Sequence, residues 1–72
     1  MNIDIHYCVA WNYEPHAASL ADELREAFGV EAKLVPGGNG IFDVIVDEKR
    51  VFSKFEAGRF PDPGEVTSIL KQ

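Results

Sequence analysis

The chain has the size, composition and charge of one small acidic domain. Its 72 residues include 12 acidic and seven basic side chains, which gives a formal net charge of −5 at pH 7. The basic residues are scattered, whereas nucleic-acid binding needs clustered Lys and Arg, so we expect no nucleic-acid partner. Apolar residues make up 46% of the chain, enough for one core over residues 1–72 and too many for a disordered chain.

Cys8 is the only cysteine, so an internal disulfide is excluded. Chains with so few cysteines are typical of reducing compartments. The first residues, MNIDIHYC, have neither the basic region nor the apolar run of a signal peptide. No apolar stretch approaches the ~20 residues that cross a membrane. These features predict a soluble, cytoplasmic protein without membrane association.

Residues 2–8 have the pattern of a β-strand. Polar and apolar side chains alternate there, and Ile3, Ile5 and Tyr7 fall on one face. A period of two with β-branched residues is typical of a strand that is buried on one side.

Residues 14–28 have the period of an amphipathic helix. The apolar positions follow the i, i+3, i+4, i+7 spacing: Ala17, Leu20, Ala21, Leu24 and Phe28. Pro15 suits a first turn, Asn12 is the candidate N-cap, and Gly29 is suited to end the helix. We expect the acidic side chains of this helix to form a solvated face.

Three further strands are predicted over residues 30–35, 41–46 and 50–55. The glycine-rich loop 36–40 precedes the second of them, which is apolar on nearly both faces and therefore expected to be central. A turn at 47–49 makes the last two strands a hairpin.

The segment Asp62-Pro63-Gly64-Glu65 predicts the start of a final helix. Aspartate at the cap, proline at the first helical position and glutamate at the third are all favourable there. The apolar stripe of this helix consists of Val66, Ile69 and Leu70.

The resulting order is β-α-β-β-β-α. A helix between the first two strands favours a right-handed parallel crossover, and the hairpin adds antiparallel strands. We therefore predict an α/β fold with a four-stranded mixed sheet and two helices on one side of it.

This order, with a cysteine at the end of the first strand, resembles a small thioredoxin-like domain. Four motifs narrow the resemblance: Tyr7-Cys8, the segment GIFDVIVD at 40–47, Ser53-Lys54, and GRFP at 58–61. Together they resemble the selenoprotein W-related family (Rdx; SelT, SelW and SelH), which has Glu where this chain has Asp43. The resemblance covers nearly the whole chain and implies a thiol-redox protein.

The resemblance also implies a redox pair at Cys8 and position 11, and this chain has Trp11. Selenoprotein members carry selenocysteine at that second position, so the residue expected to be most reactive is absent. A single thiol can still form a mixed disulfide with glutathione or a protein thiol, which an external thiol then releases. The prediction is monothiol chemistry at Cys8, with glutathione as a thiol partner and no bound cofactor.

This chemistry requires that the Cys8 sulfur is reachable from solvent and that its anion is favoured. A helix N-terminus favours a thiolate, and we expect the first helix to begin near Asn12, about one turn after Cys8. His6 would share the strand face of Cys8, and an imidazolium there would favour the anion as well. His6 is therefore the candidate tuner of the thiol.

Each of these residues also has a structural interpretation. Free cysteine is among the most buried residue types, so Cys8 is compatible with simple packing. Trp11 is compatible with folding back onto the core. If Trp11 is exposed, however, the apolar loop from Val9 to Tyr13 predicts a surface for a substrate, a partner protein or a second copy of the chain.

Arg59 and Phe60, from the last motif, are candidates for the same partner or substrate surface. Their structural alternative is that Phe60 packs before the final helix while Arg59 is merely exposed. A non-catalytic interaction domain, homodimeric or bound to another protein, is therefore the second functional prediction.

A metal site is not expected. His6, Cys8 and His16 are three scattered candidates, whereas structural zinc takes four ligands, usually in paired clusters. His16 is expected to be a solvated residue of the helix's first turn. The glycines of PGGNG are followed by a strand and not by a helix, so they do not form a phosphate loop.

Overall fold

A central strand, β1 (Ile3–Cys8), organises the fold. The computed structural model describes residues 1–72, in which β1 pairs in parallel with β2 (Lys33–Gly37) and antiparallel with β3 (Phe42–Val46). β3 pairs antiparallel with β4 (Lys49–Ser53), so the strand order is β2-β1-β3-β4. The predicted mixed, four-stranded sheet is confirmed, but β2 covers Lys33–Gly37 and not the predicted residues 30–35.

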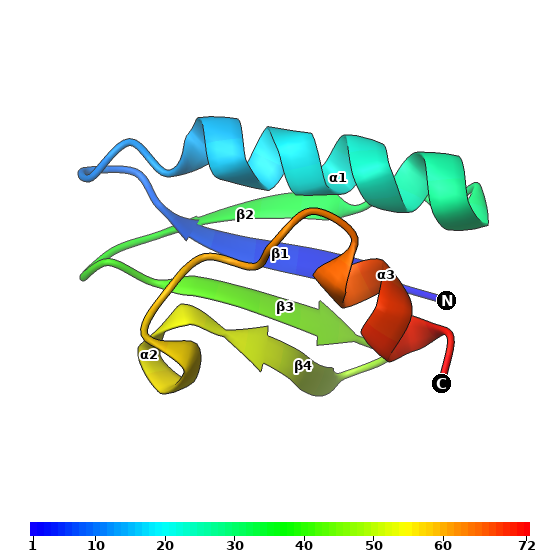
Figure 1. Ribbon diagram of the computed structural model, residues 1–72. Helices are drawn as coiled ribbons and strands as arrows, with labels where there is room; N and C mark the ends of the chain where they lie inside the picture. Colours follow the sequence, from blue (N-terminus) through cyan, green and yellow to red (C-terminus); the bar gives the residue numbers. More distant parts are fainter.

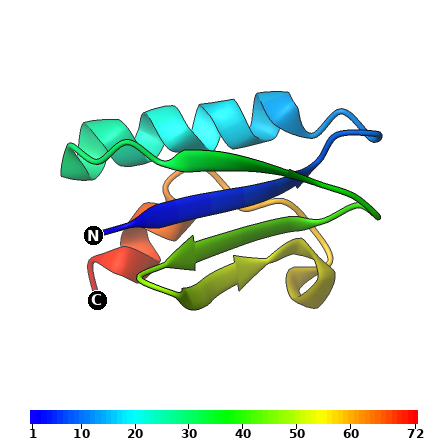
Figure 2. The same cartoon turned by 180° about the vertical axis from the view of Figure 1, so that it is seen from behind.

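Two helices cover one face of the sheet and leave the other face without a helix. α1 (Glu14–Phe28) and α3 (Glu65–Leu70) lie on the same side, and the short α2 (Lys54–Ala57) lies beside the end of β4 (Figure 1). Seen from behind, the strands lie in front of α3, and α1 runs along the upper edge of the view (Figure 2). The thioredoxin-like α/β fold class is confirmed. α2 is a third helix that was not predicted.

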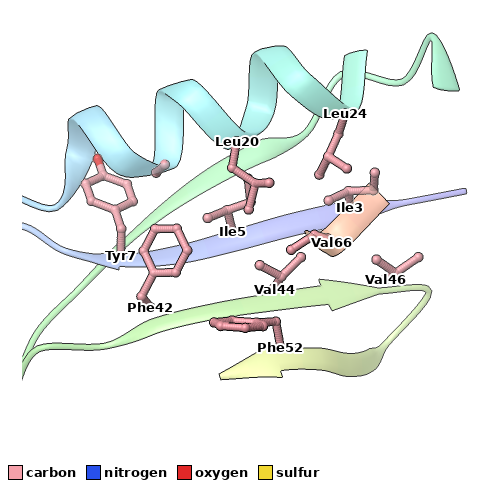
Figure 3. Close-up of a cluster of buried hydrophobic side chains, with 11 residues drawn as sticks. Ile3, Ile5, Tyr7, Leu20, Leu24, Phe42, Val44, Val46, Phe52 and Val66 are labelled. Atoms are coloured by element: carbon pink, nitrogen blue, oxygen red, sulfur yellow. The ribbon is translucent and has the colours of Figure 1, made fainter. Parts of the chain in front are cut away.

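The alternation along β1 separates the two faces of the sheet. Its core-facing residues join a cluster of 11 buried side chains between the sheet and the helices (Figure 3). The largest completely buried members of this cluster are Ile5, Leu24, Phe42, Val44 and Val66. Each contributes about 1.5–3 kcal/mol relative to an exposed position, and together they hold α1 and α3 against β1 and β3.

α1 has the predicted length but not the predicted N-cap. Tyr13 occupies the cap position without a side-chain hydrogen bond, and Asn12 instead adopts a left-handed conformation with φ of 58°. Asn12 therefore turns the chain into the helix and does not cap it. Pro15 lies in the first turn, and Gly29 ends the helix in a left-handed conformation, both as predicted.

The predicted strand over residues 50–55 ends early, at Ser53. Lys54 and Phe55 belong to α2, which Gly58 closes with φ of 74° and an N–H bond to the Lys54 carbonyl at 2.7 Å. A glycine in this conformation is a common helix terminator, and it closes the single turn of helix that follows β4. As a result the Phe55 side chain is exposed and does not join the core.

The final helix also begins later than predicted. Gly64, with φ of 81°, takes the cap position, and α3 starts at Glu65. Asp62 and Pro63 lie outside it, because the left-handed glycine interrupts the helical path after them. The predicted capping role of Glu65 is retained in part, since its carboxylate accepts a hydrogen bond from the Asp62 N–H at 2.8 Å.

Glu23 connects the two longer helices. From α1 its carboxylate accepts bonds from the Gly64 N–H at 3.0 Å and from the Thr67 hydroxyl at 2.6 Å. These bonds satisfy donors at the start of α3 that no residue of α3 itself satisfies. The prediction of a fully solvated acidic face on α1 is therefore wrong at this position.

Candidate functional site

Cys8, the predicted reactive residue, is completely buried. It is the last residue of β1 and pairs with Gly37 of β2. Because β2 and β3 flank β1, the chain that connects them must cross the end of β1, where Cys8 lies. The expectation of a solvent-reachable sulfur is therefore wrong. The sequence pattern could not reveal this, because the crossing depends on the order of the strands in the sheet.

Two close contacts hold the segments around Cys8 together. The Val9 N–H donates to the Gly37 carbonyl at 3.1 Å, which continues the β1–β2 pairing beyond the last strand residue. A Cβ at Gly37 would lie 2.9 Å from Cγ2 of Ile41, so the Ile41 side chain packs directly on this glycine. The end of β1 is thus covered by the β2–β3 connection.

The first helix begins at Glu14, the first residue of the predicted helical period, and Tyr13 takes the cap position expected for Asn12. Residues 9–13 therefore separate Cys8 at the end of β1 from the first turn of α1. Because the effect of a helix dipole fades within the first turn, a role of α1 in favouring the Cys8 anion stays a prediction.

His6 lies beside Cys8 on the helix-free face of the sheet. β1 is regular through Cys8, so residues two apart point the same way, and His6 is half-buried. Its partner in the antiparallel ladder is Asp43, which is buried and lies 3.8 Å from the Arg50 guanidinium. The role of His6 as a tuner of the thiol stays a prediction.

An aromatic cluster lies next to the loop that follows Cys8. The rings of Tyr13 and Phe60 meet edge to face at 4.8 Å, and Trp11 meets Tyr13 in the same way at 6.1 Å. Phe60 also contacts Phe42 at 5.2 Å and stacks on His16 at 3.8 Å. Three residues predicted to share a surface, Trp11, Tyr13 and Phe60, are therefore neighbours.

Two members of this cluster were not predicted from the sequence. The Lys54 ammonium lies 5.6 Å from the Tyr13 ring centroid and 5.3 Å from that of Phe60, within cation–π range. His16 is exposed in the first turn of α1, as predicted, but one face of its ring is stacked on Phe60. The Ser53-Lys54 motif pointed to Lys54, but without a role for it.

Arg59 is occupied by an ion pair that holds the start of α3. Its guanidinium donates to both carboxylate oxygens of Glu65, at 2.7 and 2.9 Å, and to the Phe60 carbonyl at 3.1 Å. The bond from Arg59, followed by that from the Asp62 N–H, lowers the pKa of Glu65 to about 2. The same pairing raises the pKa of Arg59. A partner-binding role for Arg59 stays a prediction.

The loop that follows Cys8 is the exposed part of this region. Val9 is 57% and Trp11 61% exposed, in contrast to 0% for Cys8. The Trp11 ring rests on Gly40, where a Cβ would lie 2.5 Å from Cζ3. We call residues 9–12 and 38–41 the loop end of the molecule, since both loops lie at one end of the sheet (Figure 1).

A shallow cleft of about 230 Å³ lies between α1 and residues 61–63, next to the aromatic cluster. No group of three or more His, Cys, Asp or Glu side chains is placed to hold a metal ion. None of the helices has the length and apolar character needed to cross a membrane.

A model of the Rdx family matches residues 2–72. Two curated relatives, the proteins named migration and invasion enhancer 1 of Mus musculus and Bos taurus, are each 34% identical over 73 aligned residues. Those alignments cover all of this chain and 64% of each relative, so the chain spans less than two thirds of their length.

Two crystal structures are similar throughout. A selenoprotein W-related protein from Vibrio cholerae has a TM-score of 0.90 and 25% identity, covering 97% of this chain and 91% of its own. A Bordetella parapertussis protein has a TM-score of 0.92 and 29% identity, covering 97% and 92%. Together with the family match, they support a thiol-redox role, as the sequence motifs predict.

Proposed function

This chain belongs to the Rdx family, and we propose that it acts as a protein-binding domain whose contact surface is the loop end. The thiol-redox character of the family would then be reduced or lost in this chain. The observation that carries the proposal is the difference in exposure between the two positions that the resemblance assigns to a redox pair.

Position 11 is the accessible one of that pair. Trp11 is 61% exposed and Cys8 is 0% exposed. In a two-thiol site one thiolate must reach the substrate disulfide, and the second then attacks the mixed disulfide and releases the substrate. Here the group that reaches solvent is an indole, which has no thiol chemistry, and the remaining thiol is the sheltered one.

An exposed indole supports binding. Tryptophan and tyrosine are enriched among the residues that contribute most of the free energy of protein–protein binding. Trp11 is held against Tyr13 and Gly40, so its position is partly ordered before a partner arrives. Such preorganisation reduces the entropy that is lost on binding.

The proposal is tested by capturing proteins from the native host on the immobilised domain and identifying them by mass spectrometry. We expect Trp11→Ala to lose proteins that Cys8→Ala retains. Ala27→Glu, on the exposed surface near the C-terminus of α1, is the control for a surface change away from the loop end. The reverse pattern, in which Cys8→Ala loses the proteins and Trp11→Ala retains them, would overturn the proposal.

A second candidate function is monothiol chemistry at Cys8. It is favoured by family membership and by the position of Cys8 at the end of β1, directly before the exposed loop. The Cys8 thiolate would attack one sulfur of oxidised glutathione, forming a mixed disulfide and releasing one glutathione thiolate. A second external thiol would then attack that disulfide and free Cys8. Because Cys8 is buried, the loop end must open first.

Mass measurement after incubation with oxidised glutathione tests this second candidate. A glutathione adduct on the folded protein, reversed by an added thiol, supports it. Modification that occurs only after unfolding in urea rules it out. Glutathione, protein thiols and a reducing, cytoplasmic location belong to this second candidate and remain proposals.

A further inference from the structure

The loop end differs from the rest of the molecule in its lack of charge. Residues 5–13 and 34–42 contain no Asp, Glu, Lys or Arg, although these residue types make up 26% of the chain. The two stretches are far apart in sequence, and both views show their loops at the same end of the sheet (Figures 1 and 2).

The opposite end is charged. A shallow hollow there is lined by Asp4, Glu31, Lys33, Asp47 and Glu48, and cations lie beside it as well: Lys49 follows Glu48, and Arg25 lies 3.8 Å from Glu31. The molecule is therefore polarised along its long dimension, with charged residues at one end and an uncharged, partly apolar surface at the other.

Three of the four exposed large apolar side chains lie at or beside the uncharged end; the fourth is the N-terminal Met1. Val9 and Trp11 lie on the loop end itself, and Phe55 on the adjacent α2 is 64% exposed. The charged residues of α2, Lys54 and Glu56, lie at the rim of this surface, where Glu56 is paired with Arg50. An apolar centre with a charged rim is the usual composition of a protein–protein contact.

From this distribution we infer that the loop end is the contact surface of a homodimer, so that the partner is a second copy of this chain. The inference rests on the proposed binding function and names its occupant. In a two-fold symmetric contact each residue near the axis faces its own copy, so a charge there would face a like charge. The loop end has no charge to repel its copy.

The distribution of the remaining charge also favours this arrangement over other ways of pairing two chains with a net charge of −5. The molecule is 30 Å long. Contact through the loop ends holds the two charged ends on opposite extremes of the dimer. Their separation then greatly exceeds the screening length of about 8 Å at physiological ionic strength.

The loop end is a small contact surface. The cross-section of the molecule, 22 × 21 Å, has less area than the roughly 800 Å² that each partner buries in a standard stable interface. We therefore expect a weak dimer, with a dissociation constant between about 10 µM and 1 mM.

Trp11 provides a direct probe, because it is the only tryptophan in the chain. The test is sedimentation velocity from about 1 µM to 1 mM protein, the range over which such a dimer would form. Trp11 emission and acrylamide quenching are followed in parallel. We expect the sedimentation coefficient to rise with concentration, the emission to shift to shorter wavelength and quenching to fall. Because the contact is uncharged, raising the salt concentration should not dissociate the dimer.

Two variants and a control locate the contact. Val9→Glu, which retains the Trp11 probe, and Trp11→Ala should each raise the dissociation constant at least about tenfold. Ala27→Glu adds the same charge as Val9→Glu near the other end of α1 and should leave it unchanged. Circular dichroism of each variant confirms that it is folded.

A chain that stays monomeric at about 1 mM would overturn the inference. So would a dimer that Val9→Glu and Trp11→Ala leave intact, or one that Ala27→Glu disrupts equally. If the chain is monomeric but Trp11→Ala still loses captured host proteins, the homodimer is refuted and the proposed binding function stands. If the dimer forms but no host protein depends on Trp11, the partner is the second copy alone.

Discussion

The indole of Trp11 lies across Gly40, so close that a Cβ at position 40 would be 2.5 Å from Cζ3. This contact joins the loop after β1 to the connection between β2 and β3, two segments that are far apart in sequence. Gly40 also has φ of 74°, so two independent reasons favour glycine there.

Alanine substitutions at three glycines separate these two reasons. Gly40→Ala should cost about 1–2 kcal/mol for the left-handed conformation, plus up to about 1 kcal/mol because the exposed indole must swing outward. Urea unfolding measures the free energy, and Trp11 emission should shift to longer wavelength in Gly40→Ala alone.

Two other glycines serve as controls for this experiment. Gly58 has the same φ of 74° and nothing within 4 Å, so Gly58→Ala reports the conformational cost alone. Gly38 has neither constraint, and Gly38→Ala should be neutral or slightly stabilising. Equal emission spectra for all three variants would contradict the Trp11–Gly40 contact.

The burial of Cys8 predicts how its replacements will rank in stability. Cys8→Ser puts a hydroxyl into a site that is 0% exposed, and a buried hydroxyl without a partner costs about 1–3 kcal/mol. Cys8→Ala loses only one sulfur atom's packing, and we expect a cost of about 1 kcal/mol. Thermal unfolding checks the order. A serine variant as stable as the alanine variant would indicate that the site is open to water.

The ion pair between Arg59 and Glu65 predicts a dependence of stability on acid. The pKa of Glu65 falls from the usual 4.5 to about 2 in the folded protein, so its ionised form favours folding above about pH 4.5. This contribution is lost as the pH falls from 4.5 toward 2. Glu65→Gln should therefore flatten the urea-unfolding stability profile in that interval.

Glu26→Gln is the control for that measurement, because Glu26 is exposed on α1 and forms no ion pair. It should lower stability little and leave the acid dependence unchanged. If both variants lose stability in parallel below pH 4.5, Glu65 is not the residue responsible.

The bonds from Glu23 predict that α3 depends on a residue of α1. Glu23→Ala removes the acceptors of the Gly64 N–H and the Thr67 hydroxyl, and bonds to a charged group contribute about 1.5–3 kcal/mol each at most. We expect the free energy of unfolding in urea to fall by about 1–3 kcal/mol. Relative to the unsubstituted chain, hydrogen exchange should accelerate in residues 64–70 and change little in β1. Glu26→Ala, on the exposed face of the same helix, should have neither effect.

Several elements follow from local patterns and could be predicted before any coordinates. The alternation of β1, the apolar stripe of α1 and the glycine that ends α1 each depend on neighbours within a few residues, as do the strands and the hairpin. The family motifs added the thioredoxin-like topology and the place of the redox position. The later start of α3 and the appearance of α2 were missed, because left-handed glycines at positions 64 and 58 overrode the propensities of the residues around them.

By itself the sequence determined the order of the four strands and the two longer helices, the family, and the replacement of the second redox residue by Trp11. Only the tertiary structure decided which of the two positions meets solvent. Cys8 is buried because β2 and β3 flank β1 and their connection crosses its end, and Trp11 is exposed because it stands beyond that crossing. Exposure depends on which distant segments lie over a residue, and the periodicity of a strand or helix carries no information about that.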